Sequence, residues 1–342
     1  MFVHNTQYLL QLLTCCIILL YSACARINSN PNFHDFVIMK NDDFLIVKTS
    51  MATECSTLAA RYLDDPDKAF LIAEFNGIEA VSSGQEVVIP LHPFRLGGLE
   101  TNGYQMVPVL AYQRVSKDRA DEVTVAMEHF EKQMKYLKKN DYHVITLDQL
   151  FNFINFKEQL PKKSIAITFD GCSDSFYEIA WPLLKKYDFC CTLFLDIDCI
   201  DTENTLSWEK INELLEMGVD IQPYINMNRN IDNIEKIKEE GTFSEYVTAI
   251  ERELIRSQEE FKRNANKECK YLAYDYSKDR KFTNLFIILL KKHGYRAAFT
   301  TRDHANPFFV DNYMINRSVI YGTYDMQKFK KSLVTFWKID LQ

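Results

Sequence analysis

Residues 164–196 constrain the fold of this chain more than any other stretch of its sequence. An apolar, β-rich run occupies positions 165–169 and ends at an acid, Asp170. A turn of small residues follows, then a helical pattern at 174–187 and a second apolar run at 191–195. Strand, helix and strand in this order predict a parallel crossover unit, in which side chains at the strand ends face a ligand-binding edge. Asp170 is therefore the first candidate for a functional residue.

The same alternation of strands and helices continues through residues 105–342. Amphipathic helices are predicted between the apolar strands, and a long polar helix is expected at 243–263. Repeated alternation of this kind favours an α/β fold with a parallel, barrel-like sheet. The predicted strands are residues 107–112, 143–145, 165–169, 191–195, 219–224, 271–274, 297–300 and 315–321.

Polar and aromatic residues stand at the ends of several of these strands. In α/β barrels the chemistry takes place at the carboxyl ends of the strands. The residues at these positions are Gln113, Asp170, Tyr224 and Tyr274. We therefore expect their side chains to border one site.

Residues 34–91 are predicted to form a separate small module before the barrel. The order strand, helix, helix, strand resembles a LysM module, most closely in residues 58–62, 72–77 and 84–90. The resemblance implies glycan binding, with peptidoglycan as one ligand. The alternative is a module that only packs against the rest of the chain. Residues 92–104 are rich in Gly and Pro and are predicted to be a linker.

Residues 1–24 differ in composition from the rest of the chain. Positions 8–21 are almost continuously apolar, and small residues precede Cys24. An apolar core that ends in small residues is typical of a secretory signal. Small residues directly before a cysteine resemble the lipobox of bacterial lipoproteins, which implies a lipid anchor at Cys24 in the bacterial envelope, in the periplasm or at the outer membrane. A plain cleaved signal and an uncleaved anchor are the alternatives.

Charge and cysteine content restrict the partners. The formal net charge of −7 argues against nucleic acid or an anionic membrane surface as a partner. Membrane contact is expected only through the N-terminal segment. The nine cysteines form no C-x-x-C pair and no zinc-finger spacing. In an oxidising compartment Cys172 has two candidate disulfide partners, Cys199 and Cys269, and the sequence leaves both open.

Four segments in order make residues 105–335 similar to the polysaccharide deacetylase family, carbohydrate esterase family 4 with its NodB-homology domain. Within the family the chain most resembles the poly-N-acetylglucosamine deacetylases, and the resemblance implies a distorted (β/α) barrel. The segments are 107–115, where that subgroup has Pro-Val-Leu-x-Tyr-His; 167–171 with 181–187, where the family has Thr-Phe-Asp-Asp-Gly and Pro-x-Leu-x-Lys-Tyr; 206–221, which precedes the family's His-x-x-x-His pair; and 272–277 with 294–301 and 315–317.

This resemblance implies metal-dependent removal of acetyl groups from an N-acetylated polysaccharide. In the family, one Asp and two His hold a divalent metal such as Zn²⁺, which polarises the acetamide carbonyl and activates a water molecule. A neighbouring Asp is the general base, and a His is the general acid. The products are a free amino sugar and acetate.

Several of these positions differ in this chain. Asp170 matches the general base of the family. The second Asp, a metal ligand, is Gly171, and the two His ligands fall on Tyr224 and Asn228, or on Tyr224 and Arg229 if the spacing is one residue longer. The position of the general acid holds Gln113. We therefore expect no metal and no other cofactor at the matched positions.

Other residues offer only a weak replacement for these ligands. None of the seven His pairs with another at a spacing of three or four residues, and only His304 follows a strand on a loop. An all-carboxylate site near Asp170 would favour Ca²⁺ or Mg²⁺ and would polarise a carbonyl less strongly. The acids that the sequence offers for such a site are Asp174, Asp196, Asp198 and Asp275.

Two functions are compatible with this pattern. The first is a non-catalytic scaffold, a pseudoenzyme that binds an N-acetylated exopolysaccharide through aromatic stacking and polar contacts. For each aromatic the alternative role is filling the barrel mouth, and for Asp170 it is capping the following turn. The second function is an active hydrolase that removes N-acetyl or O-acetyl groups, with Asp170 as base. The predicted glycan-binding residues are Gln113, Tyr224, Asn228, Tyr274, Tyr276 and Arg317, with Tyr112 as a further stacking candidate.

Overall fold

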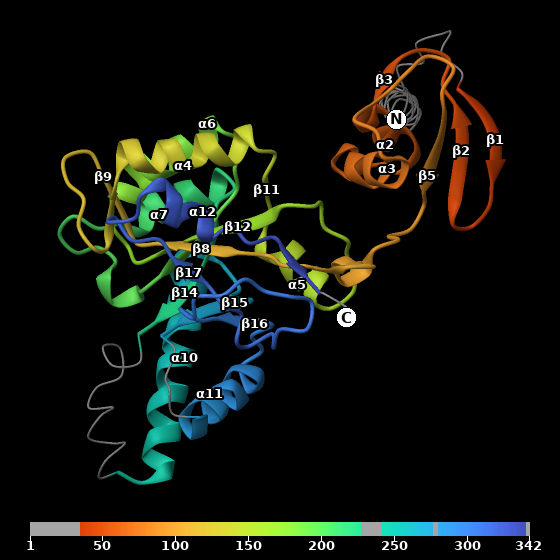
Figure 1. The fold of residues 1–342 in the computed structure, drawn as a ribbon. Coiled ribbons are helices and arrows are strands. Elements are labelled where there is room, and N and C mark those ends of the chain that lie inside the picture. The colour runs from red at the N-terminus through yellow and green to blue at the C-terminus, as the bar shows by residue number, and fades with distance from the viewer. Residues whose placement is uncertain (1–34, 227–240, 276–279, 340–342) are drawn as a thin grey trace, which may run out of the picture. The chain divides into compact units, whose positions relative to one another are not determined.

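The structure is a computed structural model that describes residues 35–226, 241–275 and 280–339 (Figure 1). By its internal contacts the chain divides into two compact units, Met1–His92 and Pro93–Gln342. Among the described helices, none has the length and apolar character needed to cross a membrane.

The first unit is a three-stranded antiparallel sheet with two helices on one face (Figure 1). Its elements are β1 (Phe36–Lys40), β2 (Phe44–Lys48), β3 (Thr53–Glu54), α2 (Cys55–Tyr62), the 3₁₀ turn η1 (Pro66–Lys68), α3 (Ala69–Asn76), β4 (Ala80–Val81) and β5 (Glu86–Pro90). The strand order is β1-β2-β5, and both helices lie in sequence between β2 and β5. Leu45 and Val47 of β2 pack against Leu58 and Ile72 of the helices. The β-α-α-β order is thus present, with β1 added at the edge of the sheet.

Residues 93–104 are part of the second unit, which corrects the prediction of a linker. They supply two strands of a small antiparallel sheet. Its strands are β6 (Leu99–Glu100), β7 (Gly103–Gln105) and β18 (Phe336–Lys338), preceded by the 3₁₀ turn η2 (Leu96–Gly98). The side chain of Arg95 is buried and donates to Gln105 Oε1 at 3.0 Å. The glycines that suggest a linker instead permit tight turns and close strand approach inside a packed sheet.

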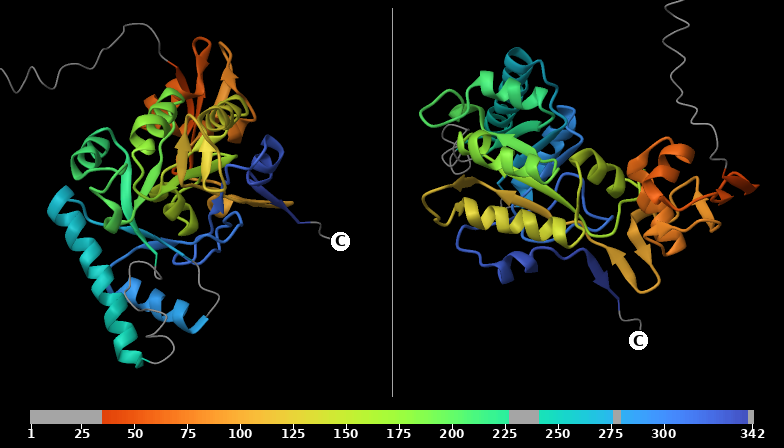
Figure 2. Two further views of the ribbon diagram at one scale, coloured as in Figure 1. Left: turned by 90° about the vertical axis from the view of Figure 1, so that its left-hand side faces the viewer. Right: turned by 90° about the horizontal axis from the view of Figure 1, so that it is seen from above.

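The second unit is built on an eight-stranded sheet with the order β16-β15-β14-β13-β12-β8-β17, and β11 pairs with the other end of β12 (Figures 1 and 2). The strands are β8 (Val109–Tyr112), β11 (His143–Val144), β12 (Ser164–Asp170), β13 (Thr192–Leu195), β14 (Asp220–Ile225), β15 (Tyr271–Tyr274), β16 (Ala297–Phe299) and β17 (Ser318–Val319). All pairs are parallel. A single bridge between Phe299 and Ile315 links the β16 edge to the segment before β17. The sheet is therefore an incompletely closed barrel, and the predicted α/β barrel architecture is confirmed.

Helices and helical turns connect the strands of this sheet, and most pack on its outer side. They are α4 (Met127–Lys139), α5 (Leu147–Ile154), the π-helical turn η3 (Phe176–Ala180), α6 (Trp181–Lys186), the 3₁₀ turn η4 (Ile197–Cys199), α7 (Trp208–Glu216), α10 (Phe243–Ala265), α11 (Arg280–Lys292) and α12 (Met326–Lys331); a two-stranded ribbon, β9 (Arg114–Ser116) with β10 (Thr124–Ala126), precedes α4. In contrast to the outer helices, α5 packs its apolar face into the barrel interior. The single helix predicted at 174–187 is divided into η3 and α6. Pro182, the second residue of α6, has no amide hydrogen to continue a regular ladder. A capping box between Thr242 and Glu245 begins α10.

The two faces of the strands pack in different layers. Along β12, Ile165, Ile167 and Phe169 join the cluster beneath α4, α6, α7 and α12, whereas Ala166 joins the cluster inside the barrel. The interior cluster also contains the apolar face of α5. Because successive residues of a strand point to opposite sides, Thr168 and Asp170 face the interior with Ala166. The position of Asp170 in the strand thus directs its side chain into the barrel.

Candidate functional site

Asp170 forms a bidentate ion pair with Arg317 in the mouth of the barrel. Arg317 Nη1 donates to Asp170 Oδ1 at 2.5 Å, and Nη2 donates to Oδ2 at 2.9 Å. The side chain of Arg317 is 0% exposed and that of Asp170 is 10% exposed. Charge-assisted pairs with two parallel hydrogen bonds fix both partners in one geometry. Both oxygens of the acid are therefore already bonded within the protein.

Arg317 is held in place by three further contacts. Its Nε donates to the carbonyl oxygen of Thr300 at 3.2 Å, and Nη1 approaches Thr168 Oγ1 at 3.3 Å. Its guanidinium carbon lies 5.1 Å from the centroid of the Phe194 ring, a cation–π distance. Burial raises the pKa of Asp170 above its usual range, while the Arg317 guanidinium opposes that shift. Arg317 thus orients Asp170, and its guanidinium is buried away from a ligand in the mouth.

A second polar pair lies at the ends of β14 and β15. The Tyr224 hydroxyl donates to Asp275 Oδ1 at 2.7 Å. Burial raises the pKa of Tyr224 far above its usual range, and the carboxylates of Asp170 and Asp275 raise it further. Tyr224 is therefore a neutral hydrogen-bond donor throughout the physiological pH range.

An open cleft of about 720 Å³ borders Asp170. The exposed side chain of Gln113 lies on its wall, next to the loop that begins at Gly171. Charged side chains of both signs complete the lining: Arg114, Lys117, Arg119, Asp118, Glu178 and Glu203. The volume is that of a small-molecule site, and polar walls with both donors and acceptors suit the hydroxyl and amide groups of a sugar.

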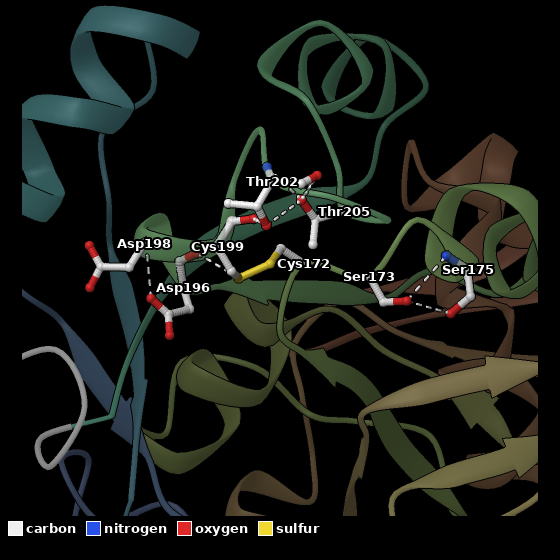
Figure 3. The surroundings of a disulfide bond; sticks show 8 residues. All are labelled: Cys172, Ser173, Ser175, Asp196, Asp198, Cys199, Thr202 and Thr205. Atoms are coloured by element: carbon white, nitrogen blue, oxygen red, sulfur yellow. Dashed lines mark hydrogen bonds between the residues drawn. A yellow bond between two sulfur atoms is a disulfide. The ribbon is translucent and has the colours of Figure 1, made fainter.

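A disulfide fixes one side of this cleft. Cys172, in the loop after β12, is bonded to Cys199, in the turn after β13, with a Cα–Cα distance of 6.1 Å (Figure 3). Asp196 Oδ1 accepts from the amide of Asp198 at 3.1 Å and caps that turn. Of the two partners that the sequence leaves open, the structure thus pairs Cys172 with Cys199. Cys269 is a free thiol.

The structure brings some of the predicted site residues together and separates others. Gln113 and Asp170 line the same cleft. Tyr224 is half-buried and lies within electrostatic reach of Asp170. Asn228 and Tyr276 lie outside the described residues.

Tyr274 and Tyr112 point away from the mouth. Tyr274 packs against Phe286 beneath α11 and donates its hydroxyl to the carbonyl oxygen of Tyr313. Tyr112 is fully buried against Phe130 beneath α4. Because β15 alternates, the next residue, Asp275, faces the site in place of Tyr274. This alternation is the sequence signal that would have identified Asp275 as a partner of Tyr224.

The other acids near Asp170 are bonded elsewhere. Asp174 pairs with Lys210 at 2.9 Å, and Asp198 pairs with Arg256 at 2.7 Å. Asp275 accepts from Tyr224, as described above. His304 lines a different cleft, beside α12. Within residues 35–226, 241–275 and 280–339, no three His, Cys, Asp or Glu side chains gather closely enough to hold a metal ion.

Comparison with known proteins shows the family of this domain. Residues 157–298 match the family profile described as polysaccharide deacetylase. A poly-beta-1,6-N-acetyl-D-glucosamine N-deacetylase of Staphylococcus aureus is 27% identical over 204 residues, which cover 58% of this chain and 68% of the relative. The solved structure of IcaB from Ammonifex degensii superposes with a TM-score of 0.56 at 19% identity, covering 68% of this chain and 97% of that structure. This chain carries a polysaccharide deacetylase domain.

The fold of the deacetylase domain is shared more widely. The Streptococcus pyogenes deacetylase PplD, solved with acetate, superposes with a TM-score of 0.56 at 18% identity, covering 67% of this chain and 98% of that structure. At this identity the likeness concerns the fold alone. The sequence-based assignment to the polysaccharide deacetylases, close to those that act on poly-N-acetylglucosamine, is confirmed by the family match and by these relatives.

The described residues of the deacetylase domain do not fit the family's divalent metal. Gly171 has no side chain, and its φ of +99° is a left-handed conformation that disfavours an acid at that position. Tyr224 offers a neutral phenol that is already bonded to Asp275. Asp170 is bonded through both oxygens to Arg317. A position without a side chain and a neutral phenol do not supply ligands for Zn²⁺, and Asp170, which matches the general base and not a ligand, already has both oxygens bonded.

Proposed function

We propose that the deacetylase domain binds an N-acetylated glucosamine polymer without hydrolysing it, and that the chain is a non-catalytic glycan-binding scaffold of the bacterial envelope. The observation that carries the proposal is the bidentate pair of Asp170 with Arg317 beside Gly171. A general base in this family acts on a metal-bound water, and Gly171 supplies no ligand for the metal. Asp170 then has the role of a structural acid that keeps the mouth of the barrel in shape.

The cleft offers contacts for an acetamide and for sugar hydroxyls. Gln113 is exposed on its wall, and a primary amide both donates and accepts hydrogen bonds, which suits the N–H and C=O of an N-acetyl group. Tyr224 is outside the lining of this cleft; its half-buried ring lies within electrostatic reach of Asp170, and we propose that a sugar face stacks on it where the bound polymer extends beyond the cleft. We further propose that Asn228 and Tyr276 contribute to the same surface.

The substrate of a relative supports an N-acetylglucosamine polymer as the ligand of this domain. The Staphylococcus aureus protein is a deacetylase of poly-beta-1,6-N-acetyl-D-glucosamine. A domain of the same family that keeps the cleft and lacks a fitting metal site would retain binding and lose hydrolysis. We propose glycan, and no nucleic acid, as the partner of this domain.

The N-terminal residues support a place in the envelope. We propose that residues 1–24 direct export and that Cys24 carries a lipid anchor, which would keep the chain at a membrane. The first unit, by its β-α-α-β order and its likeness to LysM modules, would bind peptidoglycan. The intact mass of the mature protein tests the lipid at Cys24, and retention of the protein on cell-wall sacculi tests the peptidoglycan ligand.

Titration of the purified protein with N-acetylglucosamine oligomers tests the central proposal. Isothermal calorimetry is expected to detect binding, and Gln113→Ala is expected to weaken it about tenfold through the loss of a hydrogen bond to the ligand. Gln327→Ala is the matched control, because Gln327 is exposed on α12 and lies outside the lining of the cleft. Absence of binding to any oligomer would overturn the proposal.

An active hydrolase is the second candidate function, and the retained Asp170 favours it. The same oligomers are incubated with Zn²⁺, Co²⁺ or Ni²⁺, and released acetate is measured. We expect no release above the protein-free control. Acetate release that disappears in a folded Asp170→Asn variant would replace the scaffold function with catalysis.

A further inference from the structure

Within residues 35–92, the first unit exposes an apolar sheet face on the side opposite its two helices. Directly opposed residues of paired strands share a face, and the pairs Phe36 with Lys48, Met39 with Ile46, and Ile46 with Val88 place these side chains on one side of the sheet. The helices α2 and α3 pack on the opposite side, against Leu45, Val47, Val87 and Ile89. We call the open side the outer face; its apolar members are Phe36, Met39, Phe44, Ile46 and Val88.

β1 is the most exposed part of this sheet. Four consecutive large apolar residues of β1 are exposed, with Phe36 at 69% and Met39 at 49%. An ordinary edge strand carries charged or polar side chains, because an apolar edge promotes aggregation. A group of neighbouring, exposed apolar side chains of this size is typical of a surface that contacts a membrane or another molecule.

The geometry of β1 disfavours another strand as the cover. The register of β1 on β2 shifts between Val37 and Met39, which leaves Ile38 in a bulge. A bulge in an edge strand twists it and interrupts the hydrogen-bonding row that an added strand needs. The strand is also only five residues long and ends at Lys40. The apolar side chains are thus presented without a regular edge for strand pairing.

The position of β1 in the chain indicates a lipid surface. Phe36 follows Cys24 by 12 residues (36 − 24 = 12). A chain of that length spans at most about 40 Å when fully extended, so an anchor at Cys24 keeps β1 close to the bilayer. The charges of the three strands and their turn nearly cancel: Lys40 and Lys48 are positive, Asp42, Asp43 and Glu86 are negative, and Lys48 lies opposite Glu86. A near-neutral apolar surface suits a zwitterionic headgroup layer, in which binding grows with the apolar area buried.

We propose that the outer face and the bulge at Ile38 rest on the membrane to which the chain is tethered. The inference rests on the proposed membrane attachment at the N-terminus and is independent of the glycan ligand. The tether limits the distance, and the apolar face sets the orientation of the first unit on the bilayer. The anchor and the apolar face would then be two separate contacts with the same bilayer, and the second grows with the apolar area that it buries.

Photolabelling of the full chain tests this contact. The protein is mixed with phosphatidylcholine vesicles that carry a diazirine in the acyl chain, irradiated, and mapped by mass spectrometry. We expect label on residues 36–39, reduced at least about tenfold in the double variant Phe36→Ser with Met39→Ser, because two apolar side chains no longer enter the lipid. Phe243→Ser is the matched control: Phe243 is 73% exposed at the start of α10 in the second unit, and its loss should leave the label unchanged.

Three results would overturn the proposal. One is label confined to residues before 35, since the tether would then be the sole contact. Another is protection of β1 from hydrogen exchange without vesicles that increases with protein concentration, because a second copy of the chain would then cover the face. The third is protection without vesicles that is independent of concentration, which would place the cover within the same chain. Circular dichroism of each variant confirms that the unit is folded, and the intact mass at Cys24 separates failure of the anchor from failure of the face.

Discussion

Arg317 donates hydrogen bonds to both carboxylate oxygens of Asp170, although the two residues are 147 positions apart in the chain. The guanidinium is fully buried and is further held by the carbonyl of Thr300 and the ring of Phe194. Asp170 reaches the mouth of the barrel at the end of β12. Its position is therefore fixed by Arg317, which directly precedes β17 near the end of the chain. The pair ties β12 to the segment that leads into β17.

Arg317→Leu is expected to lower the free energy of unfolding by about 3–5 kcal/mol, because Asp170 would stay buried without its cation. Urea denaturation followed by circular dichroism measures the change. Arg263→Leu is the matched control: Arg263 pairs with Glu260 on the surface of α10 and is 69% exposed, and its loss is expected to cost at most about 1 kcal/mol. Equal effects of the two substitutions would contradict a structural role for the buried pair.

Tyr224→Phe is expected to lower the free energy of unfolding by about 1.5–3 kcal/mol, since it removes a partly buried hydrogen bond to a charged acceptor and keeps the ring. The bond lost is the one from the Tyr224 hydroxyl to Asp275. Tyr177→Phe removes a hydrogen bond to Glu213 on the surface and should have a smaller effect. If the Tyr224→Phe variant were as stable as the wild type, a water molecule would have replaced the Tyr224 hydroxyl as the donor to Asp275.

Reduction of the Cys172–Cys199 disulfide is expected to lower the free energy of unfolding by about 3.5 kcal/mol, because the bond closes a loop with a sequence separation of 27. Thermal unfolding with and without a reducing agent measures the loss as a lower Tm. In the double variant Cys172→Ser with Cys199→Ser, the reducing agent should have no effect on Tm. A wild-type Tm that is insensitive to reduction would show that this bond is absent in the folded protein.

The free thiols are expected to react slowly in the folded protein. Burial raises the pKa of Cys190 to about 11 and that of Cys269 to about 12. Only the thiolate attacks an alkylating reagent, so at pH 8 about one in a thousand Cys190 side chains is reactive, and the fraction rises about tenfold for each pH unit toward the pKa. Alkylation with iodoacetamide, followed peptide by peptide, measures the rates. The unfolded chain is the control. Rapid labelling of Cys190 or Cys269 in the folded chain at pH 8 would disprove the burial of these thiols.

Periodic patterns made the fold predictable at the level of its elements. The apolar run that ends at Asp170, the helix after it and the second apolar run appear in the structure as β12, η3 with α6, and β13. The alternation of strands and helices predicted the parallel barrel because each element carries its own hydrophobic period. The stretch at 93–104 was misread, since Gly and Pro mark tight turns within a sheet as well as flexible linkers.

The site was less predictable, because side-chain direction changes with every residue of a strand. Tyr274 was predicted to face the ligand, yet it packs beneath α11, and the next residue, Asp275, faces the mouth. Arg317 was predicted to bind sugar, yet it is buried against Asp170. No local pattern marks a pair 147 positions apart.

The sequence by itself determined that a strand delivers an acid to the mouth of an α/β barrel, and its resemblance to the family predicts that Gly171, Tyr224 and Gln113 stand at the positions of metal ligands and of the general acid. These are properties of local hydrophobic period and of residue identity, and both can be read from the chain. Only the tertiary structure decided that Asp170 is bonded to Arg317, that Cys172 is bonded to Cys199 and that Asp275 meets Tyr224. The second and third contacts join the ends of neighbouring strands, whereas the first passes over β8, which lies between β12 and β17. Each depends on how the strands align across the sheet, and alignment is set by packing of the whole barrel.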